Sequence, residues 1–151
     1  MRTAAVAGLS VLALAALAAC GHGDAGAPTS GQPETITEVE WRLVAIQWAD
    51  GHVTRPADPS GYILELGPEG RVRGQADCNR LMGTYALDAS RLEFGPLATT
   101  RMACPPGSLA PDWLRALGSA STWLVRDGHL HVALADDAGT IELASTAVDS
   151  R

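Results

Sequence analysis

Lysine is absent from this chain of 151 residues, and all eleven of its basic side chains are arginine. Together with the many alanines and glycines, this indicates a GC-rich genome and carries no structural information. Acidic residues outnumber basic ones, so the net charge is −6, and no run of basic residues stands out. Nucleic acid binding needs a basic surface, and we therefore expect no nucleic acid partner.

Catalytic motifs are also absent. The sequence contains no Gly-x-Ser-x-Gly nucleophile turn, no His-Glu-x-x-His zinc motif and no phosphate-binding loop. A cysteine nucleophile would need a histidine close by to lower its pKa, and Cys78 or Cys104 with His129 is formally such a pair. We expect a protein that is not an enzyme and that holds no cofactor.

The longest apolar stretch lies at the N-terminus, over residues 4–19. It follows one positive charge, Arg2, and ends in Leu17-Ala18-Ala19 directly before Cys20. A basic start, an apolar centre and small residues before a cleavage point are typical of a secretory signal. The stretch is also shorter than the ~20 residues of a spanning helix.

A cysteine after Leu-Ala-Ala resembles the lipobox of bacterial lipoproteins, in which the thiol is acylated and the chain is cut before it. We expect residues 1–19 to be a lipoprotein signal peptide and Cys20 to carry a membrane anchor of fatty acyl chains such as palmitate. The alternative is an ordinary cleaved signal. Gly21, rather than Asp, follows Cys20, which resembles lipoproteins sorted to the periplasmic face of an outer membrane.

The rest of the chain has the size of one domain. Residues 20–35 are rich in small and polar side chains without a hydrophobic period, so they predict a flexible tether. The folded domain is expected over residues 36–145, followed by a disordered tail at 146–151. Removal of residues 1–19, whose only charge is Arg2, takes the net charge from −6 to −7.

Short strand-like runs dominate the expected domain. In the first run the apolar alternation shifts phase between Leu43 and Val44, which predicts a β-bulge. Asp88-Ala89-Ser90 and Asp127-Gly128 predict tight hairpins. Strands are expected at residues 39–48, 62–66, 71–76, 83–87, 91–94, 97–102, 121–126, 129–135 and 140–144.

One segment has the period of a helix. Leu109, Trp113, Ala116, Leu117 and Ala120 recur at spacings of three and four residues. Ser108 is the expected N-cap, Pro111 falls in the first turn and Gly118 stands near the end. The apolar stripe should pack on the sheet, where we expect all four tryptophans (Trp41, Trp48, Trp113 and Trp123) to anchor the core.

Several blocks in the middle of the chain form a recognisable pattern. They are Gly-Gln-Ala-Asp-Cys-Asn-Arg at 74–80, Gly-Thr-Tyr at 83–85 and Leu-Ala-Thr-Thr-Arg-Met-Ala-Cys-Pro at 97–105. Over residues 37–144 the sequence resembles the META domain family, the HslJ-like bacterial envelope proteins. The resemblance implies an α+β fold, in which a strongly curved antiparallel β-sheet, a half-barrel of seven to eight strands, packs on one short helix. It implies no agreed activity, although some members are associated with envelope stress.

Cys78 and Cys104 are the first candidate site. If Cys20 is lipidated, they remain as an even pair in an oxidising compartment. A disulfide would close a loop of about 27 residues and stabilise the fold by about 3–4 kcal/mol. Two buried free thiols are the alternative, and redox or metal chemistry is a more remote one.

Asp77, Asn79 and Arg80 form a polar motif around Cys78. They could bind a ligand at the end of a sheet. The structural alternative, which we favour, is that Asn79 bonds to neighbouring backbone and that Arg80 pairs with Asp77 or another acid.

His129 and His131 would share one face of a strand because they are two residues apart. With a cysteine they could bind zinc, but the chain offers no closer group of ligands. A solvated strand face is the expected role, and we expect no metal.

These observations favour a non-enzymatic cell-envelope lipoprotein with a META domain, a stress-associated accessory or binding factor. Its partners would be the membrane, through Cys20, and an unknown envelope protein. The alternative is a carrier that holds a small hydrophobic ligand between sheet and helix. A thiol-redox enzyme using Cys78 and Cys104 is the remote alternative.

Overall fold

The computed structural model describes residues 35–146. The expected signal peptide, Cys20, nearly all of the expected tether and residues 147–151 lie outside the described residues. Within the described part, no helix is both long enough and apolar enough to cross a bilayer.

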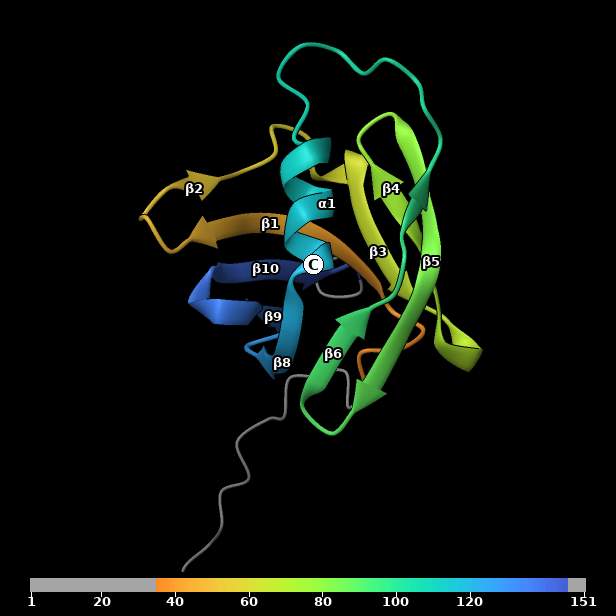
Figure 1. The fold of residues 1–151 in the computed structure, drawn as a ribbon, viewed down its shortest axis with the longest axis vertical. Coiled ribbons are helices and arrows are strands. Elements are labelled where there is room, and N and C mark those ends of the chain that lie inside the picture. The colour runs from red at the N-terminus through yellow and green to blue at the C-terminus, as the bar shows by residue number, and fades with distance from the viewer. Residues whose placement is uncertain (1–34, 147–151) are drawn as a thin grey trace, which may run out of the picture.

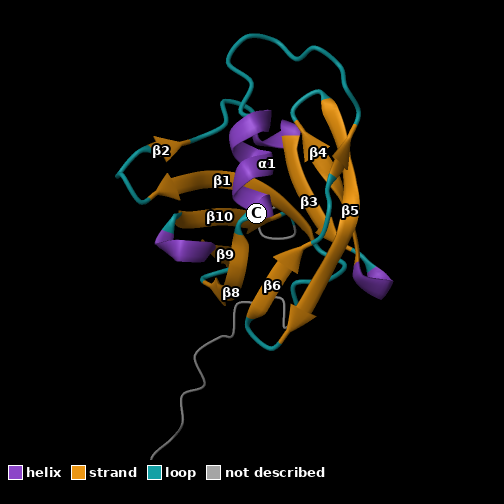
Figure 2. Ribbon diagram, viewed as in Figure 1, coloured by secondary structure: helices purple, strands orange, loops and turns teal. Residues whose placement is uncertain are grey.

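Figures 1 and 2 show the strands and helices of residues 35–146. The strands are β1 (Glu40–Trp48), β2 (Val53–Thr54), β3 (Tyr62–Leu66), β4 (Arg71–Ala76), β5 (Asn79–Asp88), β6 (Arg91–Phe94), β7 (Ala98–Thr99), β8 (Ala120–Arg126), β9 (His129–Leu134) and β10 (Gly139–Ser145). The helices are α1 (Ala110–Gly118) and the 3₁₀ turns η1 (Pro59–Gly61), η2 (Pro68–Gly70) and η3 (Ala135–Asp137).

The strands form one antiparallel sheet that closes on itself. The neighbours run in the order β10-β9-β8-β6-β5-β4-β3-β1, and β1 also pairs with β10, so eight strands enclose a barrel (Figure 1). The expected half-barrel is therefore wrong in this respect, because the last strand returns to pair with the first. The α+β class, the strongly curved sheet and the single α-helix agree with expectation.

Two of the strand ladders in the barrel, β1–β10 and β6–β8, differ greatly in length. The β1–β10 ladder runs from the Trp41–Ser145 pair to the Trp48–Gly139 pair. β6 and β8 are paired only at Arg91 and Thr122. The helix α1, which precedes β8, contacts β6 and β4 and crosses the front of the barrel in Figure 2. We call the β6–β8 contact the short seam.

The bulge predicted in β1 is confirmed. The register against β10 shifts between Leu43 and Ala45, and as a result the adjacent residues Ala45 and Ile46 are both buried. At the far end of the same ladder, Gly139 has a φ of +150°, and a Cβ there would lie 2.1 Å from the carbonyl oxygen of Gln47. This close approach requires glycine.

Hydrophobic side chains from the strands and from α1 fill the barrel. Trp41 and Trp113 are fully buried, and their indole N–H groups donate to the carbonyl oxygens of Ile36 (3.0 Å) and Gln75 (3.1 Å). Trp48 and Trp123 are only partly buried against this core. Two of the four tryptophans therefore anchor the core, and two border it. The large fully buried aliphatic side chains are Ile36, Leu43, Ile46, Leu64, Leu66, Leu81, Leu92, Leu117, Leu130, Val132, Ile141 and Leu143.

The start of α1 differs from expectation by one residue. The N-cap is Leu109 rather than Ser108, although the Ser108 hydroxyl accepts a bond from the Ala110 N–H at 3.3 Å. The Leu109 N–H donates to the hydroxyl of Tyr62 at 2.8 Å. This bond ties the start of the helix to β3.

Candidate functional site

The β4–β5 turn consists of Asp77, the first residue of the polar motif, and Cys78. Ala76 pairs with Asn79, so Asp77 and Cys78 alone form the connection. Asp77 has a φ of +58°, a left-handed conformation that Asp tolerates better than most residues. Its N–H donates to the carbonyl oxygen of Gly61 at 2.6 Å. In this structure Asp77 shapes the turn.

Cys78 and Cys104 form a disulfide, with their Cα atoms 5.5 Å apart. It joins the β4–β5 turn to the loop between β7 and α1, across 26 positions of sequence. Both thiols are consumed by this bond, so neither cysteine is a free nucleophile or ligand in this structure.

Asn79 holds the same loop through both ends of its amide. The Asn79 Nδ2 donates to the Met102 carbonyl oxygen at 3.2 Å and lies 3.2 Å from the Cys104 Sγ. The Asn79 Oδ1 accepts from the Met102 N–H at 2.7 Å and from the Thr100 hydroxyl at 3.0 Å. One side chain thus satisfies both backbone groups of Met102. We call Asn79, Thr100 and Met102, together with the disulfide, the Asn79 clamp.

The clamp explains why one predicted strand is short. A strand was expected over residues 97–102, but only Ala98 and Thr99 pair with β5. The Thr100 N–H still donates to the Arg80 carbonyl oxygen at 3.1 Å, and the Arg80 N–H donates to the Thr100 hydroxyl at 3.0 Å. Apart from this one backbone bond, the segment from Thr100 to Met102 is held by side-chain bonds instead of a strand ladder.

Arg80 is the exception within the polar motif. Its side chain is exposed, and no ion pair joins it to Asp77 or to any other acid among residues 35–146. The expected pairing with Asp77 is therefore not formed.

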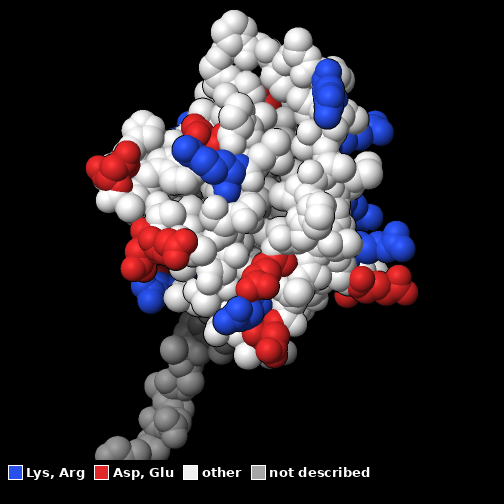
Figure 3. All heavy atoms as spheres, viewed as in Figure 1, with Lys and Arg blue, Asp and Glu red and all other residues white. Residues whose placement is uncertain are grey.

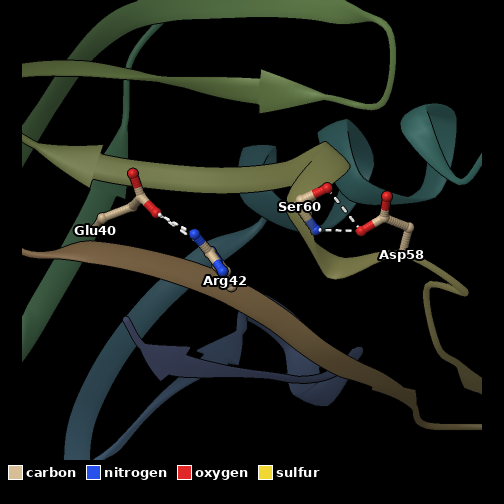
Figure 4. A network of polar contacts seen from close by, with 4 residues as sticks. All are labelled: Glu40, Arg42, Asp58 and Ser60. Atoms are coloured by element: carbon tan, nitrogen blue, oxygen red, sulfur yellow. Dashed lines mark hydrogen bonds and ion pairs between the residues drawn. The ribbon is translucent and has the colours of Figure 1, made fainter. Parts of the chain in front are cut away.

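Figure 4 shows a second polar cluster, of which Arg42, Asp58 and Ser60 line a hollow of about 510 Å³ between β1, η1, β9 and β10. The Arg42 guanidinium donates to the Glu40 carboxylate at 3.1 and 3.2 Å. Asp58 accepts from the Ser60 hydroxyl (2.6 Å) and the Ser60 N–H (2.9 Å). These two bonds, with a smaller effect from the Arg42 charge, lower the pKa of Asp58. The hollow thus has a carboxylate held by Ser60 on one side and an arginine held by Glu40 on the other.

His129 borders this hollow from β9. Its Nδ1 lies 2.8 Å from the Glu142 Oε1, and its ring stacks on His131 with 6.4 Å between centroids. Both rings are half-buried, so the expected solvated face is partly covered. Among residues 35–146, no three His, Cys, Asp or Glu side chains are placed to hold a metal ion.

Sequence reasoning did not find the Arg42–Asp58 cluster. The residues come from separate segments that meet only because β1 lies beside both β3 and β10. No local spacing signals such a meeting.

The comparisons with known proteins agree with this architecture. A sequence model of the META domain matches residues 34–146. The chain belongs to the META domain family. Among curated proteins, none matches the chain at a significant level.

Three solved structures are similar to this META domain. One, an NMR structure of a protein from Burkholderia xenovorans, is 30% identical with a TM-score of 0.62, covering 77% of this chain and 85% of that one. A duf4847 family protein from Bacteroides vulgatus is 15% identical with a TM-score of 0.54, covering 74% and 94%. A further NMR structure is 22% identical with a TM-score of 0.54, covering 76% and 94%. The last two support the fold alone.

Proposed function

We propose that this META domain protein is a non-enzymatic lipoprotein of the cell envelope, a stress-associated accessory factor that binds its partner through the outside of its barrel. The lipid anchor on Cys20 is supported by the lipobox-like Leu17-Ala18-Ala19-Cys20. The proposed location is the periplasmic face of an outer membrane, in keeping with Gly21.

The filled interior of the closed barrel is the observation that carries the binding role. Small-molecule sites are concave, with enough room to bury most of the ligand. Here Trp41 and Trp113 lie fully buried where sheet and helix meet. This packing counts against a carrier of hydrophobic ligands and leaves the outer surface for recognition.

The disulfide supports a non-catalytic role. A cysteine nucleophile needs a free thiolate, and both cysteines of the described chain are bonded to each other. Asn79 donates toward the Cys104 sulfur and also holds Met102, so the surroundings of the disulfide are structural.

The anchor is tested in bacterial cells that produce the full chain or its Cys20→Ala variant. The expected wild-type product sediments with membranes, and its N-terminal peptide has the mass of an acylated Cys20. The variant should lose both properties. An unmodified Cys20 in the wild type would contradict the anchor.

The binding role is tested with the chain from Gly21 onward. The buried hydrophobic core lies between Ile36 and Leu143, so this piece contains the whole barrel. As bait on detergent-solubilised envelope, it should retain the same protein in repeated experiments. A native mass spectrum of the bait that shows a bound small molecule, without any retained protein, would contradict the proposal in favour of the carrier.

A further inference from the structure

Exposed methionine is concentrated in one part of the barrel. Among residues 35–146, the most exposed large hydrophobic side chains are Met102, at 62%, and Met82, at 57%. Met82 lies on β5 opposite Ala98 of β7, and Met102 follows β7 by three residues. Large apolar side chains left in water at neighbouring positions are a feature of binding surfaces.

The Asn79 clamp fixes Met102 while leaving its side chain in water. Both backbone polar groups of Met102 are bound to Asn79, and the disulfide fixes the chain two residues further on. A rigid loop loses little conformational entropy when it binds, which increases affinity. Met102 is thus presented as a preorganised apolar tip.

Two arginines without an ion-pair partner accompany the methionines. Arg80 precedes Met82 by two residues, so both project from the outer face of β5. Arg101 directly precedes Met102. Both arginines are exposed, and neither has an ion pair with a described acid, in contrast to Arg42, Arg73, Arg91 and Arg115. In Figure 3, basic side chains at the upper right edge have no acidic side chain between them.

We propose that Arg80, Met82, Arg101 and Met102 form a docking surface for an envelope protein that presents an apolar pocket rimmed by carboxylates. The inference rests on the proposed function and names the surface through which it would work. Methionine and arginine are enriched at protein interfaces, and methionine adapts its shape to a pocket. A groove of about 340 Å³ beside Arg80 and Met82, lined also by Ile63 and Gln75, can accept a side chain from the partner.

The docking surface runs along the outer face of β3, β4 and β5. The described chain begins at Thr35, and Thr37 forms a bridge with Leu66 at one end of β3. The opposite end of β3, at Tyr62, pairs with Ala76 beside the clamp. Met82 pairs with Arg73, which pairs with Glu65 next to Leu66, so the docking surface extends from the clamp to the end of β3 at which the described chain begins.

Photocrosslinking in cells that produce the full-length chain tests this surface. A photoreactive benzoylphenylalanine replaces Met102 in one variant and Met82 in a second. In the matched control it replaces Leu124, which is 45% exposed on β8. We expect one discrete protein adduct at the first two positions, absent at Leu124, in which the crosslinked peptide of the partner lies beside acidic residues.

Charge reversal tests the role of the arginines. Arg80→Glu with Arg101→Glu should lower the adduct yield at least tenfold, because like charges would then face the carboxylates of the partner. Arg55→Glu with Arg126→Glu changes the net charge equally, on exposed arginines outside this surface, and should leave the yield within a factor of two. Urea midpoints of the purified variants show that the barrel remains folded.

Several outcomes would overturn the docking surface: an adduct with phospholipid, no adduct, an equal adduct at Leu124, or a yield that the reversal leaves unchanged. Membrane fractionation of the same cells reads the anchor separately. Anchored protein without an adduct defeats the docking surface and leaves the lipoprotein proposal standing. A specific adduct with a protein, on a chain whose Cys20 is unmodified, supports the docking surface and contradicts the lipid anchor.

Discussion

The Asn79 clamp and the short seam are two places where the backbone ladder stops, and each is held together differently. At the clamp, an exposed loop is fixed by a disulfide and by the amide of Asn79. At the short seam, β6 and β8 share only the Arg91–Thr122 pair, while α1 packs over the core beside them. A segment with little apolar area to bury needs directional or covalent links, whereas a segment over the core can rely on burial.

Removal of the packing near the short seam should have the largest effect. Trp113 is fully buried, and Trp113→Ala removes its packing and its bond to the Gln75 carbonyl oxygen. We expect a loss of about 3–5 kcal/mol in the free energy of unfolding, measured by urea denaturation with the disulfide intact. A loss below about 1 kcal/mol would show that burial does not hold this region.

Removal of the covalent link at the clamp should come next. Cys78→Ser with Cys104→Ser is expected to lower the free energy of unfolding by about 2–4 kcal/mol, chiefly by freeing the unfolded chain. The native near-ultraviolet spectrum should persist, because the barrel core does not include the disulfide. A lost native spectrum would mean that the clamp, and not burial, organises the barrel.

Loss of the polar half of the clamp should be smaller and local. Asn79→Ala leaves the N–H and carbonyl of Met102 without their partner, at a cost of about 1–3 kcal/mol. Hydrogen exchange at the Met102 amide should accelerate while exchange in the β1–β10 ladder stays unchanged. An unchanged rate of hydrogen exchange at the Met102 amide would show that Asn79 does not hold this loop.

The smallest effect separates Trp113, which lies in the core, from Trp123, which borders it. The buried Nε1 of Trp123 has no hydrogen-bond partner, whereas that of Trp113 donates to Gln75. Trp123→Phe should therefore cost about 1 kcal/mol less than Trp113→Phe, since only the second change breaks a bond. Equal losses in the free energy of unfolding, measured by urea denaturation of both variants, would contradict a stabilising role for the Trp113–Gln75 bond.

Local features of the fold could be predicted well from the sequence. The strands over residues 62–66 and 71–76 have the expected bounds, and Asp127 and Gly128 form the expected two-residue turn, both with positive φ. The bulge near Val44 was visible as a change of phase in the apolar alternation. Each of these signals lies within a few residues of sequence.

Long-range closure could not be predicted in the same way. The pairing of β1 with β10 joins residues about a hundred positions apart, and no local pattern distinguishes a half-barrel from a closed one. For Asn79, the sequence indicated bonds to neighbouring backbone, but Met102 lies 23 positions away. The exposure of Met102 could not be predicted either, because a single apolar residue in a loop belongs to no hydrophobic pattern from which its burial could be inferred.

Closure of the barrel also changes how copies of this protein can meet. A free strand edge is a template on which another chain can add a strand, and a closed ladder hides that template. Among residues 35–146, the strands outside the closed ring are β2 and β7, each two residues long. With the lipid anchor proposed above, molecules side by side on one membrane would be crowded in two dimensions, and apart from the short seam this architecture gives them little edge on which to aggregate.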